Sequence, residues 1–187
     1  YPVRAMDDGE TLEMGEVRFE LMHTPGHTPE HISLLVTDRS RGDEPAILFS
    51  GGALLVGDLA RPDLLGGEEE TRRGAESFCA TLQHKILPLP DFVEVFPTHV
   101  AGSLCGGNIG SRLSTTIGYE RRMNQLLSSL SSSDEFVRQC MDLTDLPAVP
   151  PYWPRMRKLN TEGPPPLRVL ADPPPLGIEE FESAREQ

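Results

Sequence analysis

The N-terminal part of the chain alternates apolar and polar residues with a period of two, which is typical of β-strands that bury one face. Two such runs, Thr11–Met14 and Val17–Met22, flank Gly15-Glu16, a pair that predicts the turn of a β-hairpin. Three further apolar runs predict buried strands, at Ile32–Thr37, Ala46–Phe49 and Val93–Phe96. We therefore expect a sheet whose neighbouring strands are mostly antiparallel.

Helical spacing of apolar residues appears between and after these strands. It predicts a helix over Thr71–Leu87, which Pro88 stops. A second helix is predicted from residue 118 or 119 to residue 130, and a third from residue 133 or 134 to residue 141. Strands and helices together predict a mixed α/β (α+β) fold.

The end of the chain is rich in proline. Ten of the 18 prolines lie between Pro147 and Pro175. Because proline fixes its own φ and restricts the residue before it, we expect no regular helix or sheet there. We expect a folded domain over residues 1–146 and an extended strap or linker over residues 147–187, which ends in a short acidic helix over Ile178–Gln187.

Charge and composition narrow the function classes. The chain has 187 residues, with 17 Lys+Arg against 29 Asp+Glu, a formal net charge of −12. This charge would repel the phosphate backbone, so a nucleic-acid partner is not expected. No apolar run approaches the roughly 20 residues that cross a bilayer, so we expect no membrane association and a cytoplasmic protein. Three widely spaced cysteines, an odd number, fit reduced thiols better than a disulfide framework.

Three predicted strands end in polar turns with unusual residues for purely structural loops. The turns follow Met22, Phe49 and Phe96, and they carry His27 in the first and His99 in the third. Side chains at the ends of separate strands can converge on one ligand. Neutral imidazole is a common zinc or iron ligand, and a histidine after Pro-Gly is held in a restricted turn. We therefore predict that His27 and His99 face a common cavity.

Other residues of these turns have simpler interpretations. A single loop histidine is more often a surface or hydrogen-bonded residue than a ligand, and we interpret His23 and His31 in this way. Cys105 lies in a turn of small residues and is expected to be a buried, inert thiol. Arg61 and Asp63 are expected to form an ion pair that staples their loop, and the alternative is that Arg61 contacts a substrate anion.

Three ordered motifs run through the turns: His23-Thr24-Pro25-Gly26-His27-Thr28, then Phe49-Ser50-Gly51 leading to Arg61-Pro62-Asp63, then Pro97-Thr98-His99 with Ala101-Gly102-Ser103. They resemble the metallo-β-lactamase superfamily, in its hydroxyacylglutathione hydrolase and persulfide dioxygenase branch. Residues 114–122 and 150–156 look like bacterial members in which such a domain precedes a rhodanese domain.

The resemblance implies an αββα sandwich with metal ions at one edge of the paired sheets, of which this chain would be the C-terminal part, with the N-terminal part missing. It implies His27 and His99 as metal ligands. The His-x-His-x-Asp-His loop of the family does not occur in the chain, and the family aspartate that follows the Phe-Ser-Gly strand end is replaced by Gly52. Asp58 is the candidate to replace this missing ligand.

The resemblance also implies a function. It implies a hydrolase or a persulfide dioxygenase that acts on a glutathione-type thioester or persulfide with one or two Zn or Fe ions, with Arg61 and Asp63 supporting the ligands or contacting substrate. The alternative is a catalytically degenerate module, because Gly52 removes an anionic ligand. Partners would be a following rhodanese-like domain or a second copy of the chain. Either would cover one exposed apolar face expected of Ile32, Leu34, Val36, Leu48, Val93 and Val95.

Overall fold

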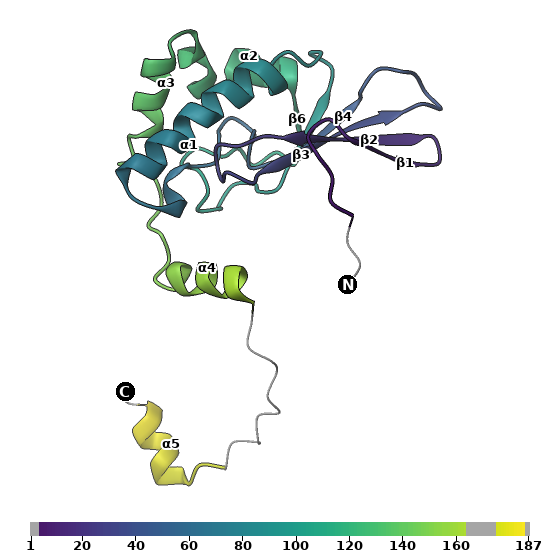
Figure 1. The fold of residues 1–187 in the computed structure, drawn as a ribbon. Helices are drawn as coiled ribbons and strands as arrows, with labels where there is room; N and C mark the ends of the chain where they lie inside the picture. Colours follow the sequence, from purple (N-terminus) through teal and green to yellow (C-terminus); the bar gives the residue numbers. More distant parts are fainter. Residues whose placement is uncertain (1–3, 164–174, 186–187) are drawn as a thin grey trace. The chain divides into compact units, whose positions relative to one another are not determined.

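The computed structural model describes residues 4–163 and 175–185. Its centre is a mixed sheet of six strands in the order β1-β2-β3-β4-β5-β6 (Figure 1). All neighbours are antiparallel except β4 and β5, which are parallel. The strands are β1 (Thr11–Met14), β2 (Val17–His23), β3 (Ile32–Asp38), β4 (Ile47–Gly51), β5 (Glu94–Pro97) and β6 (Thr115–Thr116).

The strands predicted from the period-two pattern are confirmed. The hairpin closes where Met14 pairs with Val17, and Gly15 has a φ of 63°, which suits glycine in the two-residue turn. The parallel β4–β5 pair requires a long crossover connection, and the helices between residues 63 and 86 provide it. β6 was not predicted, because two residues are too short to show a period.

The helices follow the prediction with two differences. They are η1 (Asp63–Leu65), α1 (Glu68–Thr81) with its π-helical continuation η2 (Leu82–Ile86), α2 (Ile117–Met123), η3 (Leu126–Ser131) and α3 (Ser133–Cys140). α1 begins three residues before the predicted start, because Glu68, Glu69 and Glu70 suit the first turn of a helix. The single helix predicted to end at residue 130 is interrupted at Asn124, which is extended and whose side chain accepts from the Leu126 amide.

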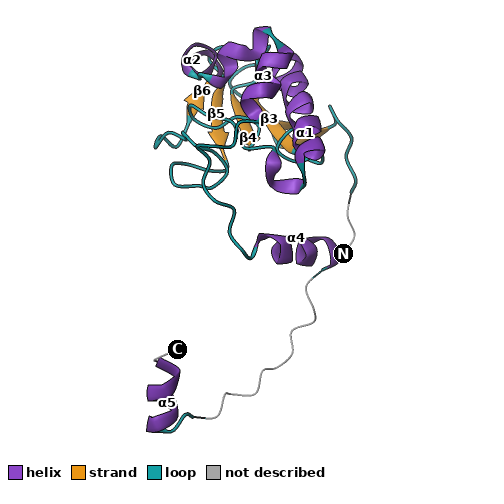
Figure 2. Ribbon diagram, turned by 90° about the vertical axis from the view of Figure 1, so that its left-hand side faces the viewer, coloured by secondary structure: helices purple, strands orange, loops and turns teal. Residues whose placement is uncertain are grey.

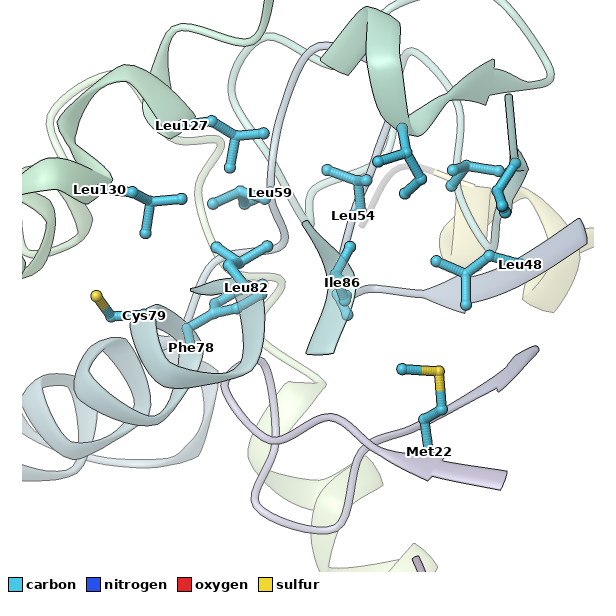
Figure 3. Packing of buried hydrophobic residues seen from close by; sticks show 14 of the residues in the cluster. Met22, Leu48, Leu54, Leu59, Phe78, Cys79, Leu82, Ile86, Leu127 and Leu130 are labelled. Atoms are coloured by element: carbon cyan, nitrogen blue, oxygen red, sulfur yellow. The ribbon is translucent and has the colours of Figure 1, made fainter. Parts of the chain in front are cut away.

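The helices gather on one side of the sheet (Figure 2). The core lies between these helices and the sheet (Figure 3). In it, Leu48 of β4 and Val95 of β5 belong to one cluster with Phe78 of α1 and with Leu82 and Ile86 of η2, and all five are fully buried. Burial of this continuous apolar layer is the main stabilising contribution to the fold.

The opposite face of the sheet is open. Ile32 and Phe49 are 46% and 45% exposed there, and the rings of Phe49 and Phe96 lie 5.9 Å apart. The predicted composition of this apolar face was wrong in part. Leu48, Val93 and Val95 are fully buried in the helix-covered core, because successive side chains of a strand point to opposite faces.

Residues 150–187 form a second unit, which is described by itself. It contains α4 (Trp153–Glu162) and α5 (Ile178–Arg185). The expectation of no helix between Pro147 and Pro175 was wrong for α4. Its only interior proline, Pro154, lies in the first turn, where no intrahelical N–H is required. The predicted acidic helix is confirmed over the described residues of α5, whereas residues 164–174 lie outside the description.

Candidate functional site

His27 lies in the turn between β2 and β3. The turn begins with buried Thr24 and passes through Gly26, whose backbone packs against Phe78 of α1. A Cβ at position 26 would lie 2.4 Å from the Phe78 ring, so only glycine allows this approach. The core therefore fixes the base of the turn directly beside His27.

The ring of His27 has a defined tautomer. Its Nδ1 lies 2.8 Å from the carbonyl oxygen of Arg61. Because a carbonyl only accepts, Nδ1 carries the proton, and the lone pair of Nε2 has no hydrogen-bond partner among residues 4–163 and 175–185. Burial lowers the pKa of His27, and the hydrogen bond to Arg61 opposes this shift only in part. His27 is therefore held neutral with Nε2 ready to accept a ligand.

Position 52 faces the edge of this ring. A Cβ built on Gly52 would lie 3.0 Å from Cδ2 of His27, the ring carbon bonded to Nε2, and 3.0 Å from the Cβ of Ala60. A short side chain at position 52 would therefore begin beside the free nitrogen of His27. Glycine provides no donor atom there.

His99 follows β5, next to the same strand end. The Thr98 amide donates to the Gly51 carbonyl at 3.1 Å, which ties the His99 turn to the end of β4. Repulsion from His99 contributes to the lowered pKa of His27, so the two imidazoles interact electrostatically. The structure thus brings His27, Gly52 and His99 to one edge of the sheet, and the role of the two histidines as ligands stays a prediction.

Comparisons with known proteins show which proteins have a similar sequence and fold. No family model matches the chain. Hydroxyacylglutathione hydrolase GloC of Haemophilus influenzae is 32% identical over 124 residues, which cover 66% of this chain and 47% of that protein. A crystal structure of a metallo-β-lactamase from Staphylococcus aureus superposes on 98% of this chain and 54% of its own, with a TM-score of 0.78 and 29% identity.

The chain belongs to the metallo-β-lactamase superfamily. Another relative is the persulfide dioxygenase ETHE1 of Bos taurus, which is 29% identical over 142 residues, 76% of this chain and 47% of that protein. The chain spans about half the length of the curated relatives it matches. Metal ions are general in this superfamily.

The described residues do not by themselves form a metal site of this superfamily. Over residues 4–163 and 175–185, no group of three or more His, Cys, Asp or Glu side chains is arranged to hold a metal ion. Gly52 offers no carboxylate beside His27. The residues present therefore do not fit a complete centre, and we assign no metal-dependent step to them.

Asp58, the candidate replacement ligand, makes other contacts. Its Oδ1 accepts from the Leu59 amide at 2.8 Å, and its Oδ2 accepts from the Asn108 amide at 2.7 Å. The side chain is buried, and desolvation raises the pKa of its carboxyl group. In this structure the carboxylate holds the loop around Asn108.

Arg61 and Asp63 form a buried, bidentate ion pair. Nε and Nη2 of Arg61 donate to the two carboxylate oxygens of Asp63 at 2.6 and 2.7 Å. Nη1 donates to the Pro147 carbonyl at 2.6 Å, and Arg61 is only 6% exposed. This geometry staples the loop and presents the backbone carbonyl of Arg61 to His27, rather than the guanidinium to a substrate.

A cavity of about 940 Å³ lies beyond this loop. Asp58, Arg61, Gln125 and Cys140 are among its lining residues, and neither His27 nor His99 is. Burial raises the pKa of Cys140 to about 12, so its thiol is unreactive at neutral pH. The cavity therefore belongs to the surroundings of Asp58 and not to the imidazole pair.

Two polar residues, one fully buried and one half-buried, were not among the predicted site residues. Glu120 is fully buried in α2 and accepts from the Thr115 hydroxyl, the Asn124 amide group and the Gly57 amide at 2.8 to 3.0 Å. A glutamate near a helix start gives no sequence signal of burial. His31 is hydrogen-bonded at both ring nitrogens, but its position in the site could not be read from the motif.

Proposed function

We propose that the chain is part of an enzyme that acts on a glutathione-type thioester or persulfide. The observation that carries this proposal is the His27 ring, which is neutral, fixed through Nδ1, and free at Nε2 beside position 52. A backbone carbonyl that accepts from Nδ1 and so selects the tautomer is typical of histidines that bind metal ions. Similarity to a hydroxyacylglutathione hydrolase and a persulfide dioxygenase supports the substrate class.

Within this proposal the chain's own residues have limited roles. His27 presents its Nε2 lone pair, and His99 provides a second imidazole at the same sheet edge. The Arg61–Asp63 pair holds the carbonyl that orients His27. Because the chain spans about half of its relatives' length, the activity is proposed for the whole protein.

A second candidate is a binding module without metal chemistry, and Gly52 favours it. Two neutral imidazoles provide no negative charge, so a divalent cation beside them would lack the compensation that a carboxylate gives. Such a module would keep the superfamily fold and offer the sheet edge around His27 to a ligand or to an associated sulfurtransferase domain.

Metal content and turnover of the whole protein, purified without chelator, separate the two candidates. The enzyme proposal predicts bound zinc or iron and hydrolysis or oxidation of a glutathione thioester or persulfide, both lost in His27→Ala. The exposed His84 provides the matched control, because His84→Ala removes a histidine outside the site. A folded wild-type protein with neither metal nor turnover would leave only the binding module.

The open apolar face supports a proposal about partners. Ile32 and Phe49 expose apolar side chains to water there, and exposed apolar patches often mark contact surfaces. We therefore propose that another protein surface, in a rhodanese-like domain or a second copy of the chain, covers this face. Sedimentation of the wild-type chain and of Phe49→Ser tests self-association: the variant should be the smaller species. Equal sedimentation of both at all concentrations would exclude a second copy.

A further inference from the structure

His31 lies directly before β3 and contacts two other segments of the site. Its Nε2 accepts the amide proton of Gly52 at 2.8 Å. Its Nδ1 lies 2.8 Å from the hydroxyl oxygen of Thr24, at the beginning of the His27 turn. The ring also lies against Gly51, where a Cβ would be 2.5 Å from Nε2 and where φ is +58°. The end of β4 is therefore shaped around this imidazole.

The hydrogen-bond directions of this cluster are determined. Because a backbone amide only donates, Nε2 of His31 is the acceptor, so the neutral ring carries its proton on Nδ1 and donates to Thr24. The Thr24 hydroxyl then donates to Ser33 at 2.9 Å, and Ser33 donates to the Ser50 carbonyl at 3.2 Å. Every donor of this buried chain has one acceptor, so the neutral His31 ring has a single orientation.

The same amide connects His31 to His27. Gly52 donates to His31 and, through its carbonyl, accepts from the Ala60 amide at 3.2 Å. Ala60 is followed directly by Arg61, whose carbonyl accepts from Nδ1 of His27 at 2.8 Å. Three hydrogen bonds thus link one imidazole to the other through the two backbone segments of the site.

We propose that His31 is a positioning residue: by holding the Gly51-Gly52 turn it fixes the Arg61 carbonyl that selects the Nδ1–H tautomer of His27. The importance of that tautomer for a ligand rests on the proposed function, whereas the chain of contacts does not. The same turn receives the Thr98 amide next to His99, so His31 contributes to the placement of both imidazoles.

Two amide side chains separate the contacts of His31. In His31→Gln, the side-chain oxygen reaches the place of Nε2 and accepts from Gly52. In His31→Asn, the shorter amide reaches only the place of Nδ1 and keeps the contact with Thr24. The two variants are matched in polarity and differ in the contact that the proposal requires.

The readout is the tautomer of His27, measured from side-chain nitrogen shifts in the complete protein at a pH where the ring is neutral. We expect wild type and His31→Gln to hold one Nδ1–H form. In His31→Asn the population of the Nε2–H form should rise, because a ring without its fixed acceptor populates both tautomers. An unchanged His27 tautomer in folded His31→Asn would overturn the proposal, and a purely structural role for His31 would lower stability in both variants alike.

A measurement on the wild-type protein keeps the proposal testable if a variant does not fold. A scalar coupling across the hydrogen bond between the Gly52 amide nitrogen and Nε2 of His31 should be detectable in labelled protein. Its absence would contradict the first contact of the chain. Neither measurement depends on metal or turnover, so failure of the proposed function leaves the inference standing, and the reverse also holds.

Discussion

Gly52 and Asp58 lie in the same loop after β4, but the two positions differ in the polar contacts made around them. At the Asp58 end, the carboxylate accepts backbone amides on both oxygens and the nearby Glu120 is fully bonded. At the Gly52 end, glycine itself provides no carboxylate, and Nε2 of His27 has no partner among the described residues. The charged groups of this loop therefore hold its backbone, whereas ligand binding at the neutral imidazole of His27 is a proposal.

The largest effect should come from removing the Asp58 carboxylate. Asp58→Ala leaves the Leu59 and Asn108 amides without their acceptor, which should lower the free energy of unfolding by about 2–4 kcal/mol. Asp58→Asn keeps an acceptor oxygen and should lose less. Denaturant unfolding of the three proteins measures this order, and equal stability of Asp58→Ala and wild type would show that the carboxylate does not hold the loop.

Adding a carboxylate at the other end should change metal binding, although its Cβ, 3.0 Å from Ala60 and His27, also requires these neighbours to shift. Gly52→Asp places a negative charge beside Nε2 of His27 and should raise zinc affinity by on the order of 100-fold. Gly52→Asn has the same shape without the charge and serves as the control. Calorimetric titration gives both affinities. If the two variants bind zinc equally, position 52 does not face a metal-binding space.

The smallest effect is a pH dependence specific to Asp58. Because burial raises its pKa in the folded state, the folded protein binds this proton more tightly than the unfolded chain does. The free energy of unfolding of wild type, minus that of Asp58→Asn, should therefore fall as pH rises from the ordinary aspartate pKa to the raised pKa of Asp58. Above the raised pKa this difference should stay constant. Denaturant unfolding across this range checks the sign, and a difference that rises with pH would show that the pKa is lowered instead.

The sequence predicted best what depends on local periodicity. The hairpin, the buried strands and α1 follow from apolar spacing, and the mixed α/β class follows from them. It failed where tertiary contacts override local signals. Asn124 breaks a helix because its side chain donates to the Asp58 carbonyl and to the Glu120 carboxylate. α4 was missed for a local reason, because Pro154 lies in its first turn, where proline is tolerated.

The site was predictable only in part, for the same reason. Pro-Gly before His27 indicated a restricted turn, and the strand ends indicated convergence with His99. Nothing in the motif showed that Arg61 acts through its carbonyl or that His31 supports Gly52, because both depend on contacts between segments far apart in the chain.

The most direct test follows the five histidines of this chain, within the whole protein, by side-chain nitrogen NMR during a zinc titration. If His27 and His99 share one space, Nε2 of His27 and one nitrogen of His99 lose their free-lone-pair shifts together, while His23, His31 and His84 keep theirs. A titration in which His27 and His99 respond at different zinc concentrations, or in which His27 does not respond, would contradict the shared site.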